Sequence, residues 1–153
     1  MNTAYIKPVV AAVLNIFNTM IDLPIVSRKP SFKKEKGPTT EVIGLISMSG
    51  SVSGFFCLGF SKKLAFCLSS KLLECQITEN NSDCMDAIGE ITNMIAGNAK
   101  SEFPDDGISI SVPKVIFDPA KDPYPTSAPV ISIPFETQEE FLLVDMSIIW
   151  NSK

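Results

Sequence analysis

Two polar side chains in the middle of the chain could act together on a partner molecule. Glu90 and Asn93 lie three residues apart in the segment Asp83–Phe103, whose apolar residues recur with the period of an α-helix. At about 100° per residue, Asp86, Glu90, Asn93 and Gly97 fall on the side opposite the apolar stripe. A carboxylate can pair with a cation, and a carboxamide both donates and accepts hydrogen bonds. The predicted outer face of this helix therefore combines an acid and an amide.

The composition of this face is unusual for one that only meets solvent. A solvated face commonly carries Glu–Lys pairs four residues apart, but here Met94 follows Glu90 and Gly97 follows Asn93 at that spacing. A helical glycine is also less favourable than alanine by roughly 1 kcal/mol. Gly97 would leave a notch beside Asn93, and Met94 would offer an apolar contact. The pattern favours close approach by another protein's backbone, with simple solvation of Glu90 and Asn93 as the alternative.

The chain of 153 residues contains no histidine. Histidine is the usual general base near neutral pH and the commonest metal ligand. Its absence excludes Ser-His-Asp triads, Cys-His dyads and histidine-based zinc sites. Carboxylates, amides, lysines, hydroxyls or thiols must supply any catalysis, unless a partner brings the missing groups.

Length and charge define the broad class of protein. A chain of 153 residues predicts one domain spanning 1–153, and the net charge of −4 argues against nucleic-acid binding. The longest apolar run, Val9–Leu14, is too short for a membrane helix, and no secretory signal pattern is visible. We therefore expect a cytoplasmic protein that does not enter a membrane.

The residue pattern predicts no metal site. No two cysteines form a C-x-x-C pair, so free and mostly buried thiols in a reducing compartment are expected rather than structural zinc. Asp105 and Asp106 belong to a turn that ends the preceding helix. The four cysteines are Cys57, Cys67, Cys75 and Cys84.

The first part of the chain predicts a helix followed by an extended basic segment. Thr3–Ile21 has the apolar spacing of an amphipathic helix, with Pro8 in or before its first turn. The segment 24–38 holds five basic residues, and its three prolines forbid a helix. We expect a solvated connection or edge strand there, whose lysines discourage edge pairing. The alternative is a docking patch for an acidic partner.

The remaining elements predict an α+β fold in which two long helices pack on a mainly antiparallel sheet. Ser61 is a candidate N-cap for a short helix that runs through Leu73. The proline-rich stretch Asp118–Pro129 predicts a loop. The expected strands are Glu41–Met48 and Ser51–Phe60, which form a hairpin, then Ile108–Val112 with Val115–Phe117, Val130–Phe135 and Phe141–Ile149.

The stretch Gly89-Glu-Ile-Thr-Asn-Met-Ile-Ala-Gly-Asn-Ala-Lys100 resembles the active helix of the CheX-type chemotaxis phosphatases, within the family that includes CheC and FliY. The similarity covers nearly the whole chain and implies a CheC/CheX-like fold. Its other segments are Ile6–Met20, Arg28-Lys-Pro, Gly44–Gly54, Ser111-Val-Pro113 and Ile133-Pro-Phe-Glu-Thr137.

The resemblance implies a phosphatase that hydrolyses the aspartyl phosphate of a CheY-type response regulator. The family's catalytic acid and amide fall on Glu90 and Asn93, and we expect Asp86, Met94 and Gly97 to contact the partner. CheC-like relatives carry a second E-x-x-N in the first long helix. The comparable stretch here, Asn-Ile-Phe-Asn at positions 15–18, lacks the acid. One working site is therefore implied. We also expect a homodimer, because CheX-like proteins can form dimers through sheet contacts.

In this interpretation the chain itself binds no cofactor or metal. The receiver domain of the regulator supplies Mg²⁺, a lysine and the phosphorylated aspartate, so the phosphatase mainly has to position a water. Asn93 would orient that water, and Glu90 would pair with the lysine of the receiver. The alternative is a non-catalytic module of the same fold that binds a regulator in a flagellar-switch or chemosensory assembly.

Overall fold

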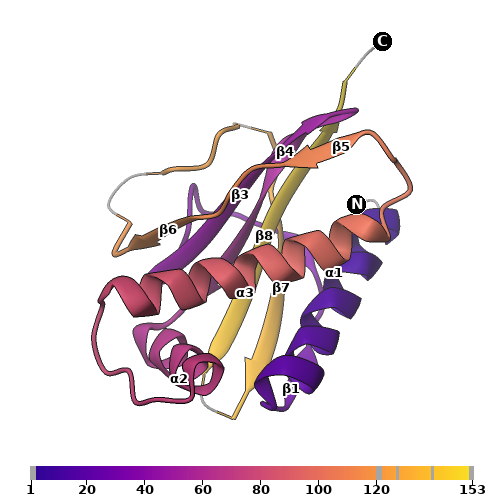
Figure 1. Cartoon of the computed structure of the whole chain (residues 1–153). Helices are drawn as coiled ribbons and strands as arrows, with labels where there is room; N and C mark the ends of the chain where they lie inside the picture. Colours follow the sequence, from indigo (N-terminus) through magenta and orange to yellow (C-terminus); the bar gives the residue numbers. More distant parts are fainter. Residues whose placement is uncertain (1–2, 120–121, 127, 139, 152–153) are drawn as a thin grey trace.

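The computed structural model describes residues 3–119, 122–126, 128–138 and 140–151, and it confirms the expected α+β fold (Figure 1). Helix α1 (Thr3–Ile16) continues into a π-helical turn, η1 (Phe17–Ile21), and is followed later by α2 (Lys62–Leu73) and α3 (Ser82–Ser101). The described strands are β1 (Ile25–Ser27), β2 (Ser31–Phe32), β3 (Val42–Gly50), β4 (Val52–Phe60), β5 (Ile108–Ile110), β6 (Lys114–Phe117), β7 (Ile131–Thr137) and β8 (Phe141–Trp150).

All the strands join one antiparallel sheet, in the order β1-β7-β8-β4-β3-β5. Strand β2 also pairs with β7, and β6 also pairs with β3. The predicted hairpin is confirmed, because β3 and β4 pair from Val42 opposite Phe60 to Met48 opposite Gly54. The long helices α1 and α3 lie on the same face of the sheet (Figure 1). This arrangement leaves the outer side of α3 facing away from the sheet.

Alternation along the central strands builds a hydrophobic cluster on each face of the sheet. In β3, Val42 and Ile46 join the main core beneath the helices, whereas Ile43 and Leu45 join a smaller cluster on the opposite face. Tyr124, from the proline-rich loop, is buried in that smaller cluster. Both faces of β3 are therefore fixed by packing, and the strand is a firm base for α3.

The first helix uses its apolar residues in the core. By length and composition alone, Thr3–Ile21 could cross a membrane. In the fold, however, Tyr5, Val9, Val13 and Phe17 are almost fully buried against the sheet and α3. This packing accounts for the apolar composition of the segment. Pro8 lies in the second turn of α1, so the expectation that it would fall in or before the first turn is wrong.

The basic segment 24–38 forms the short strands β1 and β2, which both pair with β7, as the edge-strand prediction requires. The expectation that its lysines are solvated is wrong for Lys33. The Lys33 side chain is 3% exposed, and its ammonium nitrogen lies 3.1 Å from a carboxylate oxygen of Asp145 in β8. A buried charge needs such a partner, because burial without one is very unfavourable. The segment is therefore fastened to the sheet as well as paired along its edge.

A close approach between α3 and β3 sets the position of the helix. A Cβ at Gly44 would overlap Thr92 Oγ1 and would lie 3.0 Å from both Cβ and Cγ2 of that residue. Thr92 is fully buried, and its hydroxyl donates a 2.7 Å hydrogen bond to the Ile88 carbonyl oxygen. The threonine side chain therefore has little freedom to move aside. Only glycine at position 44 lets α3 lie this close to the sheet.

We expect Gly44→Ala to lower the free energy of unfolding by about 1–3 kcal/mol, because the added methyl group overpacks the contact with Thr92. Urea unfolding followed by circular dichroism measures the change. Thr92→Ala removes the clashing atoms, so Gly44→Ala should be less destabilising in that background. An equal loss of stability in both backgrounds would contradict the proposed contact.

Candidate functional site

Capping residues mark the start of helix α3, and its buried residues determine its rotation on the sheet. The Asn81 side-chain oxygen accepts a 2.8 Å hydrogen bond from the Cys84 backbone N–H at the N-terminus. Asp83 in the first turn and Lys100 in the last complement the helix dipole. Its fully or almost fully buried core face consists of Cys84, Ile88, Ile91, Ile95 and Ala99. The opposite face must therefore point to solvent.

The structure brings the predicted acid and amide together on that outer face. Glu90 and Asn93 are both exposed, and they line one groove together with Asp86. Within the described part of the chain, neither Glu90 nor Asn93 has a side-chain hydrogen bond or an ion pair. Their polar groups are consequently available to a partner, and the fold does not depend on them.

The groove has a volume of about 500 Å³, and its second wall comes from a distant part of the sequence. Pro113, directly before β6, and Val115 within β6 form this wall, and Met85 and Gly89 line the groove from α3. Spacing within one helix could not predict this wall. The signals that the sequence did contain were the glycine at position 89 in the middle of a helix and the Ser-Val-Pro segment ending at Pro113.

The other predicted contact residues lie beside the groove. Gly97 is exposed, and a Cβ placed there would have nothing within 4 Å, so open space does adjoin this turn of α3. Met94 is half-buried and packs against the main core, so only part of its side chain faces outward. A contact of Asp86, Met94 or Gly97 with a partner stays a prediction.

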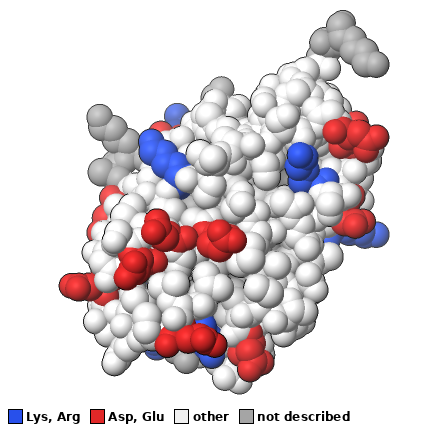
Figure 2. All heavy atoms as spheres, viewed as in Figure 1, with Lys and Arg blue, Asp and Glu red and all other residues white. Residues whose placement is uncertain are grey.

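The charge around the groove is negative. Acidic side chains gather over the N-terminal half of α3 in the space-filling view (Figure 2). Asp83, Asp86 and Glu90 are exposed on this helix, which has no basic residue before Lys100. Lys114 is exposed on β6, but it is not among the residues that line the groove. A partner surface that fits this groove should carry positive charge.

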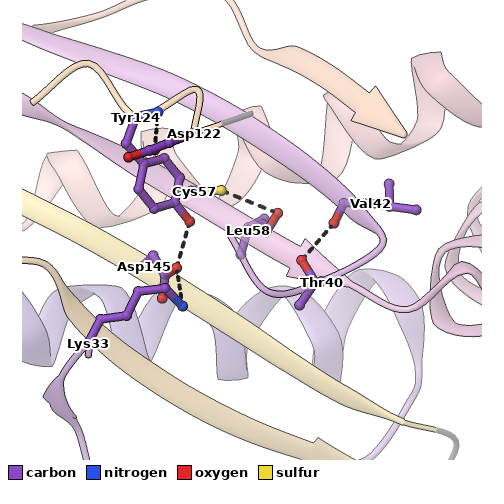
Figure 3. A network of polar contacts seen from close by, with 8 residues as sticks. All are labelled: Lys33, Thr40, Val42, Cys57, Leu58, Asp122, Tyr124 and Asp145. Carbon is purple, nitrogen blue, oxygen red and sulfur yellow. Dashed lines mark hydrogen bonds and ion pairs between the residues drawn. The ribbon is translucent and has the colours of Figure 1, made fainter. Parts of the chain in front are cut away.

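A buried polar cluster on the opposite face of the sheet is a second candidate site (Figure 3). The Tyr124 hydroxyl donates a 2.6 Å hydrogen bond to Asp145, which also pairs with Lys33. Burial raises the pKa of the nearby Cys57 thiol to about 12, and burial is also the main cause that raises the pKa of Tyr124. Both groups therefore stay protonated near neutral pH, and a thiol in that state is a poor nucleophile.

Access also argues against catalysis at this cluster. The side chains of Lys33 and Asp145 are only 3% and 5% exposed, so a substrate could not reach them. The cluster instead ties the loop of Tyr124 and the basic segment to the sheet. All four cysteines are free, and no group of three metal-ligating side chains occurs among residues 3–119, 122–126, 128–138 and 140–151. The groove along α3 is the better candidate.

Comparisons with known proteins identify the family and the fold of the chain. The family model for the chemotaxis phosphatase CheX matches residues 42–136, which is more than half of the chain. The crystal structure of a CheX protein from Desulfovibrio desulfuricans is 28% identical, with a TM-score of 0.86 over 95% of this chain and 99% of that chain. No functionally curated protein matches the sequence significantly.

Two further solved structures have the same fold. A CheC-like superfamily protein from a Shewanella species is 25% identical, with a TM-score of 0.85 over 97% of this chain and 99% of that one. A complex of CheX, CheY, BeF₃ and Mg²⁺ from Borrelia burgdorferi contains a chain that is 22% identical, with a TM-score of 0.78 over 94% of this chain and 97% of that one. At that identity the latter likeness establishes the fold alone.

We expect Gly97→Ala to raise the free energy of unfolding by about 0.5–1 kcal/mol, because the new methyl group meets open space and alanine is the better helix former. Urea unfolding is the measurement, and Gly44→Ala is the matched glycine substitution with the opposite expected sign. A loss of stability in Gly97→Ala would mean that the fold itself requires this glycine.

Proposed function

Because the chain belongs to the CheX family of chemotaxis phosphatases, we propose that it hydrolyses the aspartyl phosphate of a CheY-type response regulator. The observation that carries the proposal is that Glu90 and Asn93 line one exposed groove with no partners in the described chain. The Borrelia burgdorferi relative crystallised with CheY, BeF₃ and Mg²⁺ supports a receiver domain as the partner.

The proposed reaction requires few reactive groups from this chain. Water attacks the phosphorus atom, the bond from phosphorus to the aspartyl oxygen breaks, and the products are the free carboxylate and inorganic phosphate. The electrophile and the Mg²⁺ that offsets its charge belong to the substrate. Catalysis of phosphoryl transfer depends mostly on position and charge stabilisation, so holding the water in line with the phosphorus can be enough. A chain without histidine can perform that step.

Asn93 has the chemistry to hold this water. Its amide can accept a hydrogen bond from the water through oxygen or donate one through nitrogen, and it does not need to ionise. The side chain is exposed on a helix whose opposite face is locked into the core. A water-positioning group gains from such a rigid base, because small misplacements greatly reduce the rate.

Glu90 has the chemistry to fix the register of docking. It lies one helical turn before Asn93 on the same face, within the exposed acidic part of α3. An ion pair between its carboxylate and the active-site lysine of the receiver would place Asn93 over the phosphoryl group. The neighbouring carboxylate of Asp86 would attract the same basic surface.

We expect Asn93→Ala to lower kcat for phosphate release on the order of 100-fold while the affinity for the receiver changes little, because the water loses its positioning group. The assay measures phosphate released from a CheY-type receiver phosphorylated with acetyl phosphate. Asn98→Ala, which removes another exposed amide of α3, is the matched control and should keep wild-type rates. Equal acceleration by wild type and Asn93→Ala would refute the assigned role.

We expect Glu90→Lys to raise KM about tenfold or more, because it places like charges at the docking contact. Screening should also raise the wild-type KM as salt is added, and it should weaken the effect of the variant. Glu102→Lys makes the same charge change outside the groove and serves as the control. A Glu90→Lys protein with wild-type KM at low salt would eliminate the ion pair.

The alternative is a module that binds the receiver without hydrolysing its phosphate. The same assay separates the two functions, because a binding module would leave the lifetime of the phosphorylated receiver unchanged or extend it. The retention of both an acid and an amide at this spacing favours the enzyme.

A further inference from the structure

The groove beside Glu90 has one polar wall and one apolar wall. The polar wall consists of Asp86, Glu90 and Asn93, and the apolar side is formed by Met85, Pro113 and Val115. Water satisfies the polar wall, whereas an exposed apolar wall gains only when another apolar surface covers it. The chemistry described for Glu90 and Asn93 makes no use of this second wall.

A further apolar residue, Val112, adjoins the groove-lining residues along the chain. It directly precedes Pro113, and it is 85% exposed, the largest value among the exposed large apolar residues of the described chain. The sequence pattern placed it in a strand, but β5 ends at Ile110 and β6 begins at Lys114. Val112 therefore lies on a short, exposed connection between two strands that both pair with β3, directly before the groove-lining residue Pro113.

Gly89 forms part of the same apolar side, although the fold does not need a glycine there. A Cβ at this position would lie 3.6 Å from Val115 Cγ2 and 3.7 Å from Pro113 Cγ, which is ordinary van der Waals contact. Alanine would fit, and it would also favour the helix. The glycine thus keeps the bottom of the groove open at the expense of helix stability.

We propose that this apolar wall, defined as Met85, Gly89, Val112, Pro113 and Val115, determines which receiver domain the protein accepts, by covering an apolar side chain that neighbours the active-site lysine of the receiver. The proposal rests on the proposed phosphatase function and names a recognition element for it. The occupant follows from charge complementarity together with the groove: the acidic side of α3 selects a basic residue, and the apolar wall selects an apolar neighbour.

The two walls would make separable contributions to recognition. Attraction between Glu90 or Asp86 and a lysine weakens as salt is added, because solvent ions screen exposed charges. Burial of an apolar side chain against Val112 and Met85 is not screened in this way. Any recognition that persists at high salt should therefore depend on the apolar wall.

The test measures KM and kcat for phosphate release from a CheY-type receiver phosphorylated with acetyl phosphate, at low salt and at 0.5 M salt. Val112→Ser and Met85→Gln should each raise KM by roughly three- to tenfold at both salt concentrations, with kcat within about twofold of wild type. The matched control is Val26→Ser, which changes a half-exposed valine on β1, and it should leave KM unchanged.

Gly89→Ala provides a readout that loss of folding cannot imitate. We expect this variant to unfold at an equal or higher urea concentration than wild type, and yet to have a higher KM, because its methyl group fills the bottom of the groove. A more stable protein that binds its receiver less well supports the proposal. Wild-type KM in a stably folded Gly89→Ala contradicts it.

The outcomes distinguish this proposal from the function on which it rests. Suppose that wild type accelerates hydrolysis and Asn93→Ala does not. If Val112→Ser and Met85→Gln then keep the wild-type KM, the proposed role of the apolar wall is refuted and the phosphatase function is supported. If wild type does not accelerate hydrolysis, the phosphatase fails, and affinity for a beryllofluoride-activated receiver becomes the readout. Weaker binding of the receiver by Val112→Ser would then still support a role of the apolar wall in recognition, and unchanged binding would refute that role.

Discussion

The position of helix α3 on the sheet depends on the contact between Gly44 and Thr92. The missing side chain at Gly44 lets a buried threonine touch the strand, and the hydroxyl of that threonine is held by the helix itself. This contact lies between Ile91 and Asn93 along the helix, so it fixes both the height and the rotation of the turn that carries the candidate site. The outer face of α3 therefore has a fixed orientation relative to the sheet.

The candidate site is separate from the interactions that stabilise the fold. Glu90 and Asn93 make no side-chain hydrogen bond or ion pair within the described residues, and Gly97 meets open space. Glycine and asparagine inside a helix lower its stability, and among the described residues nothing packs at Gly97 to recover that loss. Residues that lower the stability of the local fold are expected at functional sites, because they serve binding to a partner. The polar cluster around Asp145 is the reverse case, because Lys33 and Tyr124 both contact one carboxylate oxygen of Asp145 within the fold.

Sequence periodicity could predict one side of the site but not the other. The spacing of Ile88, Ile91 and Ile95 sets the core face of α3, so it also sets which side chains point outward. The apolar wall from Pro113 and Val115 reaches the helix only through the pairing of β6 with β3, which is a non-local contact. In the same way, the lysine-rich segment indicated an edge strand, but the burial of Lys33 depends on Asp145 from the far end of the chain. The periodicity of a single helix or strand predicted neither contact.

In the proposed reaction, one amide on a rigid helix accelerates the hydrolysis of an acyl phosphate carried by another protein. The most direct test of this role is a single-turnover measurement of receiver dephosphorylation at saturating concentrations of wild type and of Asn93→Ala. We expect wild type to shorten the lifetime of the phosphorylated receiver on the order of 100-fold, whereas the variant binds equally well and leaves that lifetime near its intrinsic value. Saturated complexes of both proteins that decay at the same rate would contradict the proposed role of Asn93.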